Sequence, residues 1–316
     1  MSDIKLFSLG GDQVSELAGS SALLEKDLQN LIENQMETFL GVRFLASEYS
    51  TGKTHKGRID SLGLDENNCP VIIEYKRHSN ENVINQGLFY LDWLLDHQAE
   101  FQLLVMKQLD RDVTESIEWG GTRLICIAAD FNKYDEHAVQ QINRNIELMR
   151  YRYFGGDLLL LELVNAQSAS GNSTNKVTAP PTTKSEPQVS SKSSTRSDTH
   201  QDRINQASPE LLALYRQICD YSDNLGDEVQ RKELKFYTAF KRIKNFASVL
   251  VWAPVRDPSI RLYLKLDPDS VTLESGFSHD VRNKGHWGTG DLEVIVRTKT
   301  DMEKALELIQ QSYQAN

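Results

Sequence analysis

The chain has 316 residues, of which 39% are hydrophobic and 25% are charged, a composition typical of a globular protein of about two domains. Its net charge of −10 excludes passive coating of DNA by a generally basic surface, because such binding depends on neutralising many phosphates. The three cysteines, Cys69, Cys126 and Cys219, lie far apart and form no CxxC pair, which excludes a disulfide framework and a cysteine zinc site.

These features predict a protein of the reducing cytoplasm. Apolar runs such as 158–161 are far shorter than the roughly 18 residues of a membrane-spanning helix, so we expect no membrane partner. The N-terminal stretch, 1–5, has no basic segment followed by an apolar core, so we expect no secretory signal.

Charge and composition divide the chain into three parts. Residues 1–166 contain 15 Lys and Arg against 26 Asp and Glu, a net charge of −11, whereas residues 206–316 contain 15 against 16, a net charge of −1. Between them, residues 167–205 consist mainly of Ser, Thr, Gln, Asn, Lys and Pro. Such a segment cannot bury enough surface to offset the entropy lost on ordering. We therefore predict two domains joined by a disordered linker.

The first domain is expected to begin with a helix and a β-hairpin. Apolar residues recur at helical spacing over 24–40, and a strand follows from Phe44. Residues 58–64 alternate as in a strand, and 71–76 form an apolar strand. Because a short acidic and Asn-rich turn at 65–68 separates them, the two strands are predicted to pair as a hairpin.

The rest of the first domain alternates helices and strands. The hydrophobic pattern predicts a helix at 83–95, a further helix without defined bounds, a strand at 122–128, a helix at 136–144, and strands at 146–151 and 158–164. This order indicates the α/β class, with a mixed sheet packed between helices.

The sharpest chemical feature is Asp60 on one hairpin strand, with Glu74 and Lys76 on the other. Residues two apart project from the same face of a strand, so Glu74 and Lys76 are expected to be neighbours. Two carboxylates beside a lysine can bind a divalent cation through oxygen, and the cation can activate water against a phosphodiester. The alternative interpretation is a solvent-facing strand with an ordinary Glu–Lys pair.

Neighbouring helices carry further candidate residues. Gln86 and Tyr90 stand about one turn apart in a Q-x-x-x-Y pattern on the helix that follows the hairpin. Glu25 and Glu33 are eight residues apart on the first helix and are therefore roughly aligned. Either glutamate can add a third carboxylate to a metal site.

The polar loop before Asp60 carries basic and imidazole side chains. His55 and Lys56 are candidates for substrate contact, with a solvated loop as the simpler alternative. Arg58 is expected to screen the acidic cluster rather than to bind DNA.

Residues of about 20–165 resemble the PD-(D/E)XK nuclease superfamily, in particular RecB-like exonucleases and the NucS-type mismatch endonuclease domain. The matching positions are Arg58-Ile59-Asp60, Glu74-Tyr75-Lys76, Gln86 and Tyr90, with Ile59 where the superfamily usually has Pro. The resemblance implies a restriction-endonuclease-like mixed sheet. It implies that Asp60 and Glu74 bind Mg²⁺ or Mn²⁺, that Glu25 or Glu33 completes the metal site, and that Lys76 assists the attacking water. Gln86 and Tyr90 would help to hold the site or the nucleic-acid backbone.

The second domain is expected to be a small α+β unit. Its predicted elements are a helix at 209–224, a strand pair within 229–241, strands at 246–251, 260–266 and 292–297, and a helix at 302–313. A basic and aromatic run at 235–244 can bind phosphates and stack bases, with a solvated strand edge as the alternative. Through 290–293 and the helix that ends at Tyr313, this half resembles an uncharacterised C-terminal domain of bacterial proteins, some of which are labelled predicted transport protein.

The sequence therefore predicts a cytoplasmic, metal-dependent nuclease that hydrolyses phosphodiester bonds in nucleic acid, with DNA as the expected partner and repair or defence as the expected setting. The second domain would select the substrate or bind a protein partner, and a homodimer is left open. One alternative is a nuclease fold that has lost turnover and serves as a binding module, which the acidic first domain favours and the intact motif residues disfavour. A transport accessory protein is a third interpretation, which rests only on the resemblance of the second domain to proteins with that label.

Overall fold

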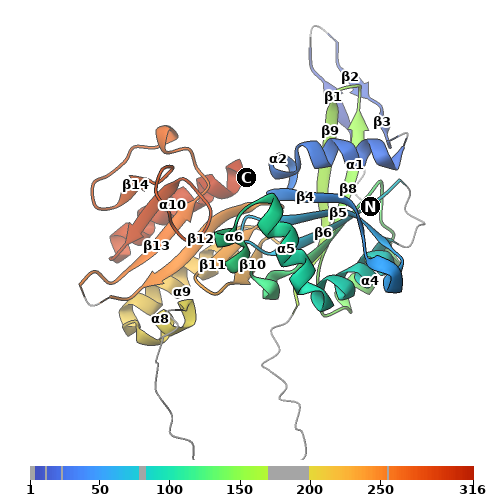
Figure 1. The fold of residues 1–316 in the computed structure, drawn as a ribbon. Coiled ribbons are helices and arrows are strands. Elements are labelled where there is room, and N and C mark those ends of the chain that lie inside the picture. Colours follow the sequence, from blue (N-terminus) through green and yellow to red (C-terminus); the bar gives the residue numbers. More distant parts are fainter. Residues whose placement is uncertain (1–3, 11–12, 23, 78–82, 170–198, 255) are drawn as a thin grey trace, which may run out of the picture.

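A computed structural model describes residues 4–10, 13–22, 24–77, 83–169, 199–254 and 256–316. These residues form two units that lie side by side, each built around its own β-sheet (Figure 1). The middle of the predicted linker, 170–198, lies outside the described residues.

The first unit contains a seven-stranded mixed sheet in the order β3-β8-β7-β6-β5-β4, with β9 paired to β8. The strands β6, β7 and β8 are parallel, and the other neighbours are antiparallel. β6 and β7 are almost continuously apolar because helices cover both of their faces. The bounds are β3 (Gly19–Ser20), β4 (Val42–Ser50), β5 (Arg58–Asp65), β6 (Pro70–Lys76), β7 (Arg123–Ala128), β8 (Asn145–Phe154) and β9 (Leu158–Gln167).

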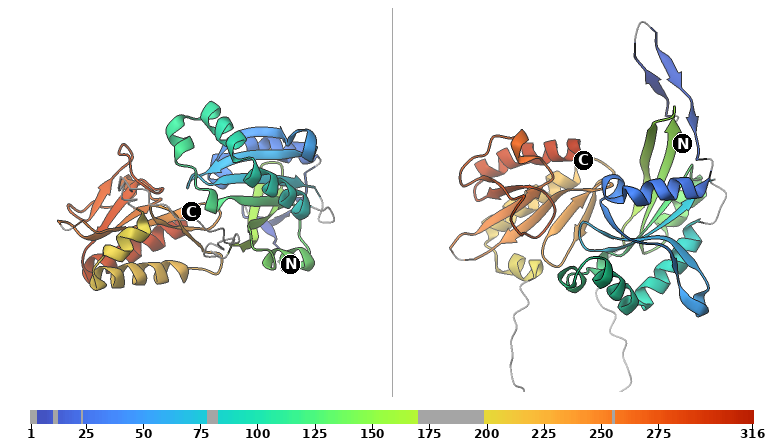
Figure 2. Two further views of the ribbon diagram at one scale, coloured as in Figure 1. Left: turned by 60° about the horizontal axis from the view of Figure 1, so that its bottom comes forward. Right: turned by 45° about the horizontal axis from the view of Figure 1, so that its top comes forward.

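Helices cover both faces of this sheet (Figure 2). On one face, α1 buries Leu28 and Ile32 against β6, and α2 adds Met36 and Leu40 to the same apolar cluster. On the other face, α4, α5 and α7 cover the core around Leu124. The bounds are α1 (Glu25–Asn34), α2 (Met36–Leu40), α3 (Gly52–His55), α4 (Val83–Asp96), α5 (Gln98–Gln108), α6 (Arg111–Glu115), α7 (Lys133–Gln140) and a 3-10 helix at Trp119–Gly121.

Two helices differ from the sequence-based expectation. The single helix expected over 24–40 is divided at Gln35, whose φ of −136° and ψ of 33° interrupt the helical backbone. α7 begins at Lys133 rather than Glu136, because the Asn132 side chain accepts hydrogen bonds from two backbone N–H groups of the first turn and caps the helix there.

A two-stranded arm projects from the first unit (Figure 1). Its strands, β1 (Leu6–Ser8) and β2 (Ser15–Leu17), are antiparallel. The sequence patterns did not predict this arm, because strands of three residues are too short to show a clear period.

The second unit is built on an antiparallel six-stranded sheet in the order β10-β11-β12-β13-β15-β14. α9 and α10 bury their apolar sides against one face of this sheet. The bounds are α8 (His200–Gln206), α9 (Pro209–Asp223), β10 (Gln230–Glu233), β11 (Thr238–Lys241), β12 (Asn245–Trp252), β13 (Ser259–Leu264), a 3-10 helix at Pro268–Ser270, β14 (Ser278–Asp280), β15 (Leu292–Val296) and α10 (Lys299–Ala315).

The stretch 167–205, expected to be a disordered linker throughout, is partly ordered. β9 ends at Gln167, and α8 begins at His200 inside that stretch. His200 is buried and its Nε2 accepts a hydrogen bond from Val251 N at 3.1 Å, so α8 is packed into the second unit. The polar composition of α8 concealed this, because only a few of its side chains are buried.

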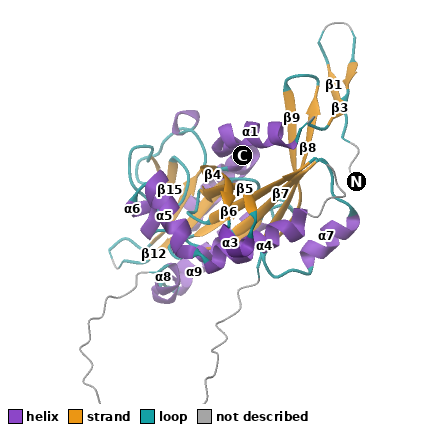
Figure 3. Ribbon diagram, turned by 45° about the vertical axis from the view of Figure 1, so that its right-hand side comes forward, coloured by secondary structure: helices purple, strands orange, loops and turns teal. Residues whose placement is uncertain are grey.

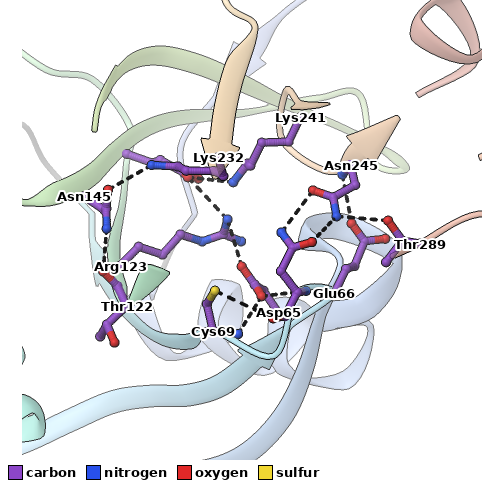
Figure 4. Close-up of polar contacts among 12 residues, drawn as sticks. Asp65, Glu66, Cys69, Thr122, Arg123, Asn145, Lys232, Lys241, Asn245 and Thr289 are labelled. Atoms are coloured by element: carbon purple, nitrogen blue, oxygen red, sulfur yellow. Dashed lines mark hydrogen bonds and ion pairs between the residues drawn. The ribbon is translucent and has the colours of Figure 1, made fainter. Parts of the chain in front are cut away.

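The two units are joined by buried polar contacts at the turn of the β5–β6 hairpin (Figure 4). Lys241 Nζ lies 2.7 Å from Glu147 Oε1, and Arg123 lies 3.5 Å from the same oxygen and 3.3 Å from Asp65 Oδ2. These charges are almost fully buried, which is tolerated because each is paired. The remaining contacts join Asn67 to Asn245 and Tyr237, Lys232 to Asn145, and Lys265 to Glu66.

Much of the basic and aromatic run at 235–244 belongs to this interface. Tyr237 and Lys241 are buried, and Lys244 Nζ donates a hydrogen bond to Thr38 O at 3.3 Å. The run therefore contacts the first unit, where the sequence suggested a phosphate-binding surface.

Candidate active site

The two candidate carboxylates lie where β5 and β6 separate. The strands pair from Ser61–Ile73 to Leu64–Pro70, and beyond Ser61 the side chains take over the hydrogen bonds. Asp60 N donates to Glu74 Oε1 at 3.1 Å, and Tyr75 N donates to Asp60 Oδ2 at 3.0 Å. Each carboxylate is therefore held by a backbone N–H group of the strand that it faces.

Glu74 is fully buried, and its Oε2 has no hydrogen-bond partner among the described residues. Burial, followed by the negative charge of Asp60, raises the pKa of Glu74 to about 9. Burial also raises the pKa of Asp60, and the Tyr75 N–H group and Lys76 oppose this shift. Near neutral pH Glu74 therefore holds a proton, because two buried carboxylates so close together resist double ionisation.

Lys76 remains a cation in this site. Its Nζ lies 3.2 Å from Glu25 Oε1, and its side chain is 13% exposed. Burial alone would lower the pKa of Lys76, but the charges of Glu25, Asp60 and Glu74 outweigh it and raise the pKa above its ordinary value. Lys76 is therefore suited to donating hydrogen bonds and to offsetting negative charge, and unsuited to accepting a proton.

The two upstream glutamates have different positions. Glu25, in the first turn of α1, reaches Lys76. Glu33 accepts hydrogen bonds from Ser61 Oγ at 2.6 Å and from Gln29 Nε2 at 2.8 Å. Because Ser61 and Asp60 are consecutive on β5, their side chains point to opposite faces, so Glu33 lies away from the carboxylate pair.

Three metal-binding side chains do not gather at this site. Within the described ranges, no three His, Cys, Asp or Glu residues are arranged to hold a metal ion. Among the described residues no third carboxylate joins Asp60 and Glu74 in such a group, although the charge of Glu25 raises the pKa of both.

Tyr90 fixes the start of β5, whereas Gln86 makes no such contact. Tyr90 Oη accepts a hydrogen bond from Arg58 N at 3.1 Å. Its ring leaves no space for a side chain at Gly57, where a Cβ atom would lie 2.4 Å from Tyr90 Cε1. The Gln86 side chain is half-buried on α4 and forms no hydrogen bond with the described residues. Tyr90 is thus a positioning residue for the strand that carries Asp60.

Sequence reasoning missed Gln29, which is buried on α1. Its Nε2 donates to Asp60 O at 2.8 Å and also contacts Glu33. Gln29 lies one turn from both Glu25 and Glu33, and this spacing was the available signal that it shares their face of the helix.

Comparison with protein families and curated proteins gives two matches. A family model described as a domain of unknown function (DUF5655) matches residues 200–316, which confirms the uncharacterised C-terminal domain. An uncharacterised protein of Haemophilus influenzae (strain ATCC 51907 / DSM 11121 / KW20 / Rd) is 27% identical over 317 residues, covering 98% of this chain and 99% of the relative.

Two solved structures show a distant likeness. A repair endonuclease from Pyrococcus abyssi has a TM-score of 0.27 and 18% identity, over 42% of this chain and 49% of that chain. An EndoMS–dsDNA complex has a TM-score of 0.25 and 17% identity, over 42% and 47%. The chain thus spans about half the length of these structures, and neither likeness assigns it an activity. No helix among the described residues is long and apolar enough to cross a membrane.

Proposed function

We propose that this protein is a metal-dependent nuclease that hydrolyses phosphodiester bonds, with DNA as its substrate. The supporting observation is the pair Asp60 and Glu74, which converge where two strands separate, beside the charged Lys76. The buried Oε2 of Glu74, without a hydrogen-bond donor among the described residues, is the kind of atom that a bound cation would satisfy.

The residues present fit Mg²⁺ or Mn²⁺. Magnesium is commonly held by one or two carboxylates together with water and substrate phosphates, so Asp60 and Glu74 suffice. A cation there would take the place of the proton that Glu74 holds in the apo protein. When bound, it would lower the pKa of a water molecule and offset charge on the scissile phosphate.

The protein's own groups have separate tasks in this proposal. Lys76, held by Glu25, donates a hydrogen bond that orients water or a phosphate oxygen. Tyr90 and Gln29 fix the backbone on either side of the Asp60 carboxylate, through Arg58 N and Asp60 O. Glu33 is assigned to holding α1 against β5 through Ser61 rather than to the metal.

A binding module without turnover is the second candidate. The absence of a third metal ligand among the described residues favours it, as does the net charge of −11 over residues 1–166. Such a protein would bind nucleic acid or a protein partner and leave phosphodiesters intact.

Cleavage of labelled single-stranded, double-stranded and branched DNA, with Mg²⁺, with Mn²⁺ and with EDTA, separates these candidates. The variants are Asp60→Asn and Lys76→Ala, with Lys304→Ala as the control, because Lys304 also forms an ion pair, with Glu274 in the second unit. We expect metal-dependent cutting that both site variants abolish and the control keeps. Cutting that survives the site variants would place the activity elsewhere, and binding without cutting of any substrate would favour the binding module.

A further inference from the structure

The helices α3 and α4 lie next to each other (Figure 3), and an aromatic pair joins them. The Phe89 side chain on α4 is 47% exposed. The ring of His55 on α3 lies 5.3 Å from the ring of Phe89, between centroids. We refer to Phe89 and His55 as the aromatic platform.

The platform is anchored to the core of the first unit. His55 contacts the ring of His97 edge-on at 5.7 Å, and His97 stacks on Trp93 at 4.9 Å with an interplanar angle of 17°. Trp93 is buried. A ring supported in this way keeps its orientation, so a ligand that stacks on it would pay little ordering entropy.

Three cationic side chains lie on the loop that carries His55. Lys53 and Lys56 flank His55 and are exposed, and neither forms an ion pair with the described residues. Arg58 is also exposed, although it contacts Glu48 at 3.4 Å. The sequence predicted that Arg58 would screen the acidic cluster at Asp60, but its ion-pair partner is Glu48. The loop thus presents three exposed cations, whereas the exposed charges of α4 that follow Phe89 are Asp92 and Asp96.

The loop that carries these cations has an unusual backbone. Lys56 has a φ of 51°, in the left-handed region that residues with a side chain rarely adopt. The loop is closed by hydrogen bonds from Thr51 N to Gly57 O at 3.0 Å and from Gly57 N to Thr51 Oγ1 at 2.9 Å. Such conformations are concentrated at binding and catalytic sites.

The platform is close to the proposed reaction centre. Phe89 is next to Tyr90, which binds Arg58 N. Asp60 follows Arg58 by two residues on β5, which corresponds to about 7 Å along a strand. A nucleic-acid strand bound on the platform would therefore pass near the acidic pair.

We propose that the aromatic platform binds an unpaired base of single-stranded nucleic acid, whose phosphates contact Lys53, Lys56 and Arg58 and whose backbone leads to Asp60. This proposal rests on the nuclease function proposed above and specifies its substrate class. An exposed ring can stack on an unpaired base, whereas in a duplex the base faces are already stacked. An acidic peptide would match the lysines but would give the Phe89 ring no flat partner.

The test measures binding separately from cleavage. Fluorescence anisotropy in EDTA gives the Kd for a labelled oligothymidylate of about 20 nucleotides, which exceeds single-strand site sizes, and for a duplex of equal length. We expect Phe89→Ala to weaken single-strand binding roughly ten-fold or more and to leave duplex binding unchanged. Phe89→Trp should keep the affinity. Phe44→Ala is the matched control, because Phe44 is 40% exposed on β4.

The salt dependence tests the cations. Removing one phosphate contact should reduce the slope of log Kd against log salt by about 0.7 for a single strand, so Lys53→Ala and Lys56→Ala should each show this change. Equal loss of single-strand and duplex binding in Phe89→Ala would overturn the proposal, as would unchanged binding of both. If DNA cleavage depends on Asp60 and Lys76 while Phe89→Ala has no effect, the nuclease function stands and the platform fails. If single strands bind through Phe89 but no substrate is cut, the platform stands and the nuclease function fails.

Discussion

The protonated state of Glu74 leads to an unusual expectation for stability: Glu74→Gln should stabilise the apo protein. Burial raises the pKa of Glu74 to about 9, whereas the unfolded chain has an ordinary carboxyl pKa of 4.5. Between these values the unfolded state releases a proton that the folded state retains, so stability falls as pH rises. At pH 7, about 2.5 pH units into this window at about 1.36 kcal/mol per unit, the loss amounts to about 3 kcal/mol.

Thermal unfolding in EDTA at pH 5, 7 and 8 measures this effect. Glutamine has nearly the shape of the neutral carboxyl and does not ionise, so Glu74→Gln should unfold about 6–12 °C above the wild type at pH 7, if 1 kcal/mol corresponds to 2–4 °C. The difference should shrink at pH 5. Glu115→Gln, an exposed carboxylate on α6, should change stability by less than about 0.5 kcal/mol.

Added Mg²⁺ should stabilise the wild type more than Glu74→Gln. The wild type should gain roughly 1.4 kcal/mol when the cation is at ten times its Kd, and the gain should increase with pH because binding displaces a proton. Glu74→Gln should gain much less. If Glu74→Gln is less stable than the wild type at pH 7 in EDTA, and wild-type stability is flat from pH 5 to pH 8, Glu74 is ionised in the apo protein and this reasoning is wrong.

Three further changes test the surroundings of the site. Tyr90→Phe removes the acceptor for Arg58 N, so stability should fall by about 1 kcal/mol and kcat should fall, while the affinity for Mn²⁺ measured by calorimetry should stay constant. Lys76→Gln should lower kcat at every pH up to 9, because the raised pKa of Lys76 keeps the amine charged over that range. A wild-type rate that rises with deprotonation of Lys76 below pH 9 would contradict this. Lys241→Ala should destabilise the protein by about 3–5 kcal/mol in urea unfolding, because it removes a buried partner of Glu147.

The sequence predicts the central part of the first unit well because its strands have simple patterns. β6 begins with an apolar run directly after a turn, and the structure places it at Pro70–Lys76, within a residue of the expectation. α4 has similarly clear bounds. α5 could not be placed because its apolar residues do not form one side: Phe101 and Val105 are buried, whereas Leu103 and Met106 are exposed.

The spacing of residues in the sequence predicts only part of the geometry of the candidate site. A period of two places Glu74 and Lys76 on one face, but it cannot show that Asp60 and Glu74 replace the ladder hydrogen bonds of their strands. The choice between Glu25 and Glu33 was also open. Eight residues of helix separate them by about 12 Å, so only one can reach Lys76, and the way α1 crosses β6 decides which.

The buried charges between the units hold the second unit against the first and make Lys241 unavailable to a phosphate. Lys241, placed by the sequence in a candidate phosphate-binding run, is fully buried against Glu147, and separating the units would expose a network of paired charges. The second unit is therefore fixed at the hairpin turn, about 17 Å along β5 from Asp60, at 3.3–3.4 Å per residue. On the first unit, Lys53, Lys56 and Phe89 are exposed and would be available to a nucleic acid bound at the acidic pair.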